Sequence, residues 1–227
     1  MALGPAPPGT SPRPEGAQVH VRNLFPTPVA ILAVPDAARI NLALEARILE
    51  REGTVESVRH SNWGGWQSPT DFPDWCGPEG EAVLEIARNM ARGLTADRRG
   101  QTPELEWRLN AWANVNRHGQ GNEFHTHPGA YWSATYYVRD GRSEGGAGEN
   151  PELGGEFEIQ DPRGVAPAML APMLAFRTAG GQSVGASEVI VPRAGNLVMF
   201  PSWLSHGVRP YHGEDVRISI ALNLTPV

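Results

Sequence analysis

The sequence predicts a mainly β (α+β) fold: an all-β barrel or a double-sheet jelly roll, flanked by two helices on its N-terminal side. Three observations carry this prediction. Short segments of alternating apolar and polar residues follow one another after Pro103, and two segments of helical periodicity precede them. The 227 residues also include 26 Gly and 21 Pro, a content typical of a turn-rich, strand-rich protein. A chain of this length suits one domain, which we expect over residues 18–227.

The N-terminal part predicts a tail, two strands and two helices. Residues 1–17 hold few apolar side chains and are expected to be a disordered tail. The apolar segments QVHVRNLF and PVAILAV favour strands. A helix is predicted over residues 37–52, with Asp36 as its N-cap and Gly53 at its end. A second helix is predicted over residues 79–94. Its apolar stripe consists of Val83, Ile86, Ala87, Met90 and Leu94.

The rest of the chain predicts strands separated by loops. The alternating segments are LEWRLNAWANVN, YWSATYYV, GGEFEIQD, SEVIVP, NLVMFPSW and VRISIALNL. Two long loops are expected, over residues 142–151 and 164–185, and loops of this kind often form walls of a substrate pocket.

The composition excludes several classes of function. The formal net charge is −6 and no basic run is present, so nucleic acid is not an expected partner. The chain contains no Lys, which excludes a lysine Schiff base and a P-loop lysine. The single cysteine, Cys76, excludes an internal disulfide and a cysteine zinc site. With no signal-peptide pattern and no apolar run of about 18 residues, we expect a cytoplasmic protein without membrane contact. A homodimer is compatible with this composition.

Three histidines form the candidate metal site. His125 and His127 are one residue apart, so on a single strand they would face the same side. His206 follows a distant predicted strand, and such a set makes a three-ligand site with open positions. Arg217 and Ser219 share one face of an otherwise apolar strand and together can clamp a carboxylate. The alternatives are loop histidines and an internal salt bridge of Arg217.

Several motifs together resemble a known family, the oxygenases that depend on 2-oxoglutarate and Fe(II) and have a double-stranded β-helix core. The pattern contains N-x-N-x-x-G, H-x-H-P, S-x-x-Y-Y-V, G-G-x-F-x-I, F-P-S-W-L-x-H and R-I-S-x-x-x-N. NLFPTPV and SNWGGWQS extend the resemblance to almost all of the chain after the tail.

This resemblance implies a function and a site. Iron would be bound by His125, His127 and His206, and the far carboxylate of 2-oxoglutarate would lie on Arg217 and Ser219. Tyr137 and Asn116 resemble residues that contact this cosubstrate, although Tyr137 also suits a core aromatic. The reaction implied is hydroxylation of a C–H bond by O2 on a small polar metabolite, an amino acid or a peptide. Succinate and CO2 would be released.

One position departs from the family pattern. His127 stands where most such oxygenases have Asp or Glu. Two other assignments stay open: Glu123 supplies the carboxylate, or His127 only supports a two-histidine site.

Substrate recognition and the overall function also leave alternatives. Trp66, Trp132, Tyr131 and Arg163 are candidate substrate contacts, but such aromatics also serve a core and such an arginine also serves a solvated surface. Two other functions fit the histidines: a three-histidine cupin dioxygenase that uses no oxoacid, and a non-catalytic metal-binding jelly roll.

Overall fold

The computed structural model describes residues 24–142, 153–164, 174, 176–178, 181–183 and 186–227. The predicted tail over residues 1–17 lies outside these ranges, as does most of the predicted strand QVHVRNLF. Most of the two predicted long loops, over residues 142–151 and 164–185, also lies outside them.

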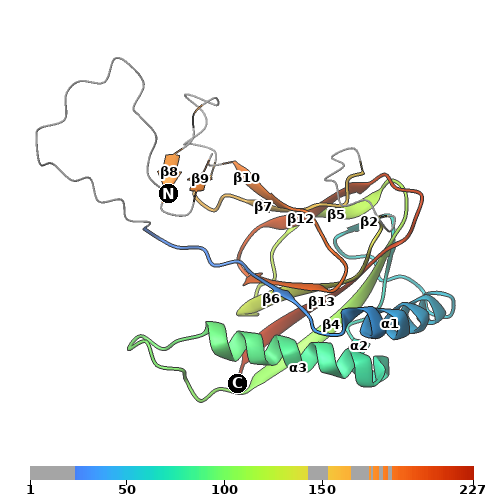
Figure 1. Ribbon diagram of the computed structural model, residues 1–227, viewed down its shortest axis with the longest axis horizontal. Coiled ribbons are helices and arrows are strands. Elements are labelled where there is room, and N and C mark those ends of the chain that lie inside the picture. The colour runs from blue at the N-terminus through green and yellow to red at the C-terminus, as the bar shows by residue number, and fades with distance from the viewer. Residues whose placement is uncertain (1–23, 143–152, 165–173, 175, 179–180, 184–185) are drawn as a thin grey trace, which may run out of the picture.

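Two antiparallel sheets face each other and form the jelly roll (Figure 1). Within the described residues, the larger sheet has six strands in the order β1-β11-β6-β13-β4-β3, and the smaller has five in the order β10-β7-β12-β5-β2. The larger sheet consists of β1 (Ala30–Ala33), β11 (Asn196–Pro201), β6 (Trp132–Asp140), β13 (Arg217–Pro226), β4 (Trp107–Asn116) and β3 (Trp66–Gln67). The smaller sheet consists of β10 (Ser187–Ile190), β7 (Phe157–Gln160), β12 (His206–Tyr211), β5 (Gln120–His125) and β2 (Asn62–Trp63). A separate pair is formed by β8 (Phe176–Thr178) and β9 (Gly181–Ser183). The predicted fold class is confirmed.

Three helices, counted over the described residues, pack on the larger sheet (Figure 1). α1 (Ala37–Glu52) has the predicted bounds, and α3 (Gly77–Leu94) begins two residues before the prediction. α2 (Phe72–Trp75) was not predicted. None of the helices in the described ranges is long and apolar enough to cross a membrane.

The predicted side-chain cap of α1 is wrong. Asp36 has a left-handed backbone with a φ of 56° and makes no side-chain capping bond. Its carboxylate instead accepts a hydrogen bond from Arg39 Nε at 2.6 Å. Gly53 follows the last residue of α1 as predicted, but with a φ of −68°, so the end of the helix does not require a left-handed glycine.

Alternation along β13 separates a core from a cavity. Ile218, Ile220 and Leu222 are fully buried in the core cluster that also contains residues of α1 and α3. Arg217 and Ser219, on the opposite face of the strand, line a cavity between the two sheets. One side of the larger sheet therefore stabilises the fold, and the other side presents polar groups to an enclosed space.

The strands that carry His125 and His206, β5 and β12, were not predicted as strands. Their sequences contain Gly121 and Gly207, which interrupt the alternating pattern. A Cβ at Gly121 would lie 2.5 Å from the Val208 carbonyl oxygen, and one at Gly207 would lie 3.0 Å from the Asn122 carbonyl oxygen. These glycines allow the backbones of β5 and β12 to approach closely. The close approach depends on how the two strands pair in the fold, so the alternation of apolar and polar residues in the sequence does not reveal it.

Candidate active site

The three predicted histidines come together where β5 meets β12. His125 is the last residue of β5 and lies opposite His206, the first residue of β12. The potential ligand atoms of His125, His127 and His206 all lie within 4.8 Å of one another. The Glu123 carboxylate is not part of this group, so the structure does not favour the alternative in which Glu123 is the third ligand.

His127 reaches the cluster from a turn and not from a strand. β5 ends at His125, so the shared strand face does not account for the position of His127. Instead its backbone N–H donates to the Ser202 carbonyl at 3.0 Å, which joins this turn to the segment between β11 and β12. The His127 ring packs against Trp112, with 5.7 Å between the ring centroids.

Backbone carbonyls orient two of the rings. His125 Nδ1 lies 2.7 Å from the Glu123 carbonyl oxygen, and His206 Nδ1 lies 2.8 Å from the Leu204 carbonyl oxygen. A carbonyl only accepts, so each Nδ1 carries the proton and each Nε2 keeps its lone pair. This is the usual arrangement of a metal-binding histidine. In the part of the chain that the structure describes, no hydrogen bond fixes the His127 ring.

Burial keeps the histidines neutral. It lowers the pKa of His206 to about 3 and the pKa of His127 to about 4, and it also lowers the pKa of His125. The neighbouring imidazoles act in the same direction on His206 and His127. At neutral pH all three rings therefore offer a nitrogen lone pair to a cation.

Arg217 lies buried in the same cavity with unused hydrogen-bonding capacity. The residue is 1% exposed, and its Nη1 donates to Asn116 Oδ1 at 3.3 Å. Among the described residues, Nε and Nη2 have no hydrogen-bond partner and no carboxylate forms a salt bridge with this guanidinium. A buried cation with two unpartnered donors is costly unless it binds an anion. The site therefore fits a carboxylate ligand.

Tyr137 completes this polar end of the cavity. Its ring centroid lies 5.3 Å from Arg217 Cζ, and its buried hydroxyl has no hydrogen-bond partner in the described part of the chain. Burial raises the pKa of Tyr137, and the neighbouring Arg217 opposes this effect. Ser219 also lines the cavity, and Asn116 lies opposite Arg217 in the β4–β13 register. The four predicted cosubstrate residues are thus neighbours.

Sequence reasoning missed several residues of this cavity. Asn114 pairs with Ser219 across β4 and β13, and Thr135 lies two positions before Tyr137 on β6. Both line the cavity. The available signal was strand alternation, because residues two positions from a predicted site residue share its face.

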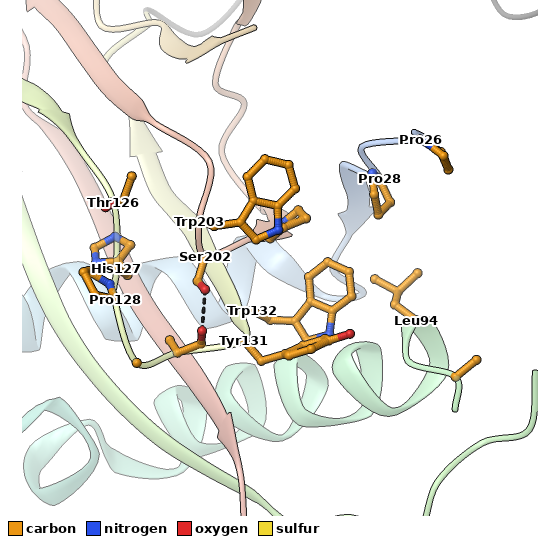
Figure 2. A pocket seen from close by; sticks show the side chains of 14 residues that line it. Pro26, Pro28, Leu94, Thr126, His127, Pro128, Tyr131, Trp132, Ser202 and Trp203 are labelled. Carbon is orange, nitrogen blue, oxygen red and sulfur yellow. Dashed lines mark hydrogen bonds between the residues drawn. The ribbon is translucent and has the colours of Figure 1, made fainter. Parts of the chain in front are cut away.

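A second cavity, of about 630 Å³, opens beside His127 (Figure 2). Tyr131 and Trp132 line it as two of the predicted substrate contacts, together with Trp203, which was not predicted. Trp66 lines neither cavity, because its ring lies in the main core and its indole N–H donates to the Val55 carbonyl at 2.8 Å. Arg163 also lines neither cavity, and its Nε donates to Asp161 Oδ1 at 2.9 Å.

Comparisons with solved structures support the fold. A prolyl-4-hydroxylase from Pseudomonas putida superposes with a TM-score of 0.57 and 18% identity, covering 87% of this chain and 91% of that chain. A prolyl hydroxylase from Trichoplax adhaerens, in complex with a hypoxia inducible factor peptide fragment, superposes with a TM-score of 0.57 and 13% identity. The match covers 87% of this chain and 83% of that chain. HygX from Streptomyces hygroscopicus, with nickel, 2-oxoglutarate and hygromycin B bound, superposes with a TM-score of 0.56 and 15% identity. The match covers 88% of this chain and 84% of that chain. At these identities the likeness establishes a shared fold.

A family model identifies the chain. No curated protein matches the sequence. The model described as "Putative 2OG-Fe(II) oxygenase" matches residues 110–223, which is half of the chain and spans the histidines and Arg217. Its match agrees with the three-histidine cluster and with the buried Arg217 guanidinium in the same cavity, two of whose nitrogen atoms have no partner among the described residues. The chain therefore belongs to the 2-oxoglutarate- and Fe(II)-dependent oxygenases and is an enzyme that uses Fe(II) and 2-oxoglutarate.

Proposed function

We propose that this enzyme hydroxylates a C–H bond of a small polar metabolite, an amino acid or a peptide, with iron on His125, His127 and His206 and 2-oxoglutarate on Arg217. The observation that carries the proposal is the Arg217 guanidinium, which lies in the same cavity as the three histidines and keeps two buried N–H groups without a partner in the described residues. In the overall reaction, R–H, O2 and 2-oxoglutarate give R–OH, succinate and CO2. One oxygen atom enters succinate and the other enters the alcohol.

The three histidines are assigned to the metal. Each would bind through a neutral imidazole nitrogen, His125 and His206 through Nε2 because Nδ1 donates to a backbone carbonyl. Bound iron supplies the oxygen activation, and the protein leaves positions open for ligands other than histidine. With His127 in place of a carboxylate, the protein contributes no negative charge to this metal.

The polar end of the cavity is assigned to the cosubstrate. Arg217 Nε and Nη2 would donate to the two oxygens of the far carboxylate as a bidentate pair. The Tyr137 hydroxyl and the Ser219 hydroxyl would donate to the same carboxylate. Asn116 accepts from Nη1 and thereby orients the guanidinium. This assignment satisfies the buried polar atoms of Arg217 and Tyr137 that have no partner among the described residues.

Apolar side chains would shield the reacting centre. Phe157 and Phe200 pack against each other with 5.0 Å between ring centroids, and both rings contact His206. Phe157 and Val208 line the cavity from the smaller sheet, and Phe200 lines it from β11 of the larger sheet. Such walls exclude water and limit unproductive oxidation.

The cupin alternative is less well supported. A three-histidine dioxygenase that uses no oxoacid has no need of a buried arginine without a counter-ion. The non-catalytic alternative does not agree with the family to which the chain belongs.

The test of this proposal is succinate release. Protein loaded with Fe(II) in air should convert 2-oxoglutarate to succinate slowly without substrate and faster when a substrate from a panel of amino acids, peptides and small acids is added. The His206→Ala variant should release none, because it lacks a ligand. Oxygen uptake that does not depend on 2-oxoglutarate would contradict the proposal.

A further inference from the structure

The second cavity is a groove beside His127 that adjoins the cavity of the metal site. His127 lines both this groove and the cavity that contains His206 and Arg217. Figure 2 shows the Trp203 ring on one side and the rings of Tyr131 and Trp132 on the other. A molecule in the groove would thus lie next to one of the assigned iron ligands. The inference below rests on the proposed function, because it concerns the substrate of that site.

The lining of the groove is aromatic, rich in proline and without charge. No Asp, Glu or Arg side chain belongs to the described residues that line it. Four prolines contribute, namely Pro26, Pro28, Pro128 and Pro201. Trp203 is 56% exposed and Tyr131 is 51% exposed, whereas Trp132 is buried and forms the base. Exposed aromatic rings gathered in this way are typical of a binding surface.

The rim also offers hydrogen-bond donors. In the described part of the chain, neither the Trp203 indole N–H nor the Tyr131 hydroxyl has a hydrogen-bond partner. The Trp132 indole N–H, in contrast, donates to Thr95 Oγ1 at 2.9 Å, and Ser202 Oγ donates to the Ala130 carbonyl. The free donors are therefore on the two exposed rings, where a ligand would meet them.

We propose that this groove binds an uncharged, extended peptide segment that contains proline and guides it to the iron site. Proline rings pack well on aromatic faces, and a proline-rich segment is already extended before it binds, so it loses little conformational entropy. Its backbone carbonyls have few internal partners and can accept hydrogen bonds from Trp203 and Tyr131. A volume of about 630 Å³ accommodates several residues of such a segment.

The same lining argues against the other substrate classes. A small charged metabolite or free amino acid would find no opposite charge among the described lining residues. A sugar needs several polar side chains around an aromatic platform. Here the hydroxyl of Ser202 is already bonded to Ala130, which leaves Thr126 as the remaining short polar side chain of the lining.

The test is a calorimetric titration of the whole chain, loaded with Fe(II) and 2-oxoglutarate in the absence of oxygen, with a blocked alanine–proline peptide. A matching alanine–glycine peptide and a neutral oligosaccharide serve as comparison probes. We expect the alanine–proline peptide to bind in the micromolar-to-millimolar range and at least tenfold more tightly than either comparison probe. Trp203→Ala should weaken its binding at least tenfold. Trp63→Ala is the matched control, because Trp63 is 60% exposed and lines neither cavity, and it should leave the affinity unchanged.

A second variant protects the test against misfolding. If Trp203→Ala melts below the wild type, Tyr131→Phe takes its place, since it removes only the rim hydroxyl and should weaken binding several-fold. Equal binding of the alanine–glycine peptide, tighter binding of the oligosaccharide, or no binding of the alanine–proline peptide would overturn the inference. Succinate release without peptide is measured in parallel. Succinate release without binding of the alanine–proline peptide would overturn only the inference that the groove binds peptide. Peptide binding without any succinate release would overturn only the proposed reaction.

Discussion

Two buried tyrosines of this protein differ in one respect that bears on function. The Tyr211 hydroxyl donates to the Gly141 carbonyl at 2.6 Å, whereas the Tyr137 hydroxyl has no partner within the described residues. A buried hydroxyl without a partner costs about 1–3 kcal/mol. The structure tolerates this cost at the position where the proposed cosubstrate would bind.

We expect Tyr137→Phe to weaken 2-oxoglutarate binding about tenfold without destabilising the unliganded protein. The free energy of unfolding should stay constant or rise by about 1 kcal/mol, because an unpartnered polar group is removed. Tyr211→Phe is the matched control. It should lower the free energy of unfolding by about 1 kcal/mol and leave 2-oxoglutarate binding unchanged. Urea unfolding and 2-oxoglutarate titration measure both effects, and a stability loss in Tyr137→Phe would contradict the assignment.

His127 decides what kind of metal centre this is. Because His127 is assigned as a ligand, its removal in His127→Ala should lower Fe(II) affinity at least 100-fold. His127→Asp should keep most of the wild-type affinity, because it supplies a carboxylate in place of the imidazole. Thr126→Ala, one residue away, should have no effect. Anaerobic titration with Fe(II) measures the affinities. An unchanged affinity in His127→Ala would assign this ring to a supporting role beside a two-histidine site.

At the scale of elements, the meeting of β5 and β12 makes the unliganded protein sensitive to pH. Burial lowers the pKa of His206 to about 3 and of His127 to about 4, while an unfolded histidine titrates near pH 6.5. Below about pH 6.5 the unfolded chain therefore binds more protons than the folded chain. The free energy of unfolding of the metal-free protein should decrease as the pH falls from about 7 to about 5.

This dependence can be assigned to the histidines. Carboxylates titrate mainly below this window, near pH 4. Urea unfolding of a His127→Gln/His206→Gln double variant should give a shallower slope than the wild type between these two pH values. A wild-type stability that does not change over this window would contradict the burial of neutral imidazoles.

The sequence predicts the elements unevenly, for physical reasons. α1 and α3 follow from an apolar stripe, and β4, β6, β11 and β13 follow from alternation, since one face of each packs on the core. β5 and β12 lack a clear alternation of apolar and polar residues, because Gly121 and Gly207 stand where the two backbones approach closely. The Asp36 cap fails because a carboxylate within reach of Arg39 forms that ion pair instead.

At the scale of the whole molecule, the site depends on both sheets. The smaller sheet and its following turn carry the histidines, and the larger sheet carries Arg217, Ser219, Tyr137 and Asn116. Motif resemblance identified the residue types, and the fold brings them into one cavity. The positions of Trp66 and Trp203 could not be foreseen, because an aromatic side chain in a sequence suits a core and a groove equally well.

The most direct test of the central claim is the visible absorption of the anaerobic complex with Fe(II) and 2-oxoglutarate. The claim is that the three histidines and Arg217 hold one metal and one oxoacid that chelates it. The wild type should show the charge-transfer band of the chelate. Arg217→Ala should bind Fe(II) normally but give the band only at a 2-oxoglutarate concentration at least tenfold higher. Arg117→Ala, which removes a partly exposed arginine paired with Glu52, should behave like the wild type. A wild type without the band, or an Arg217→Ala variant with unchanged 2-oxoglutarate dependence, would contradict the account.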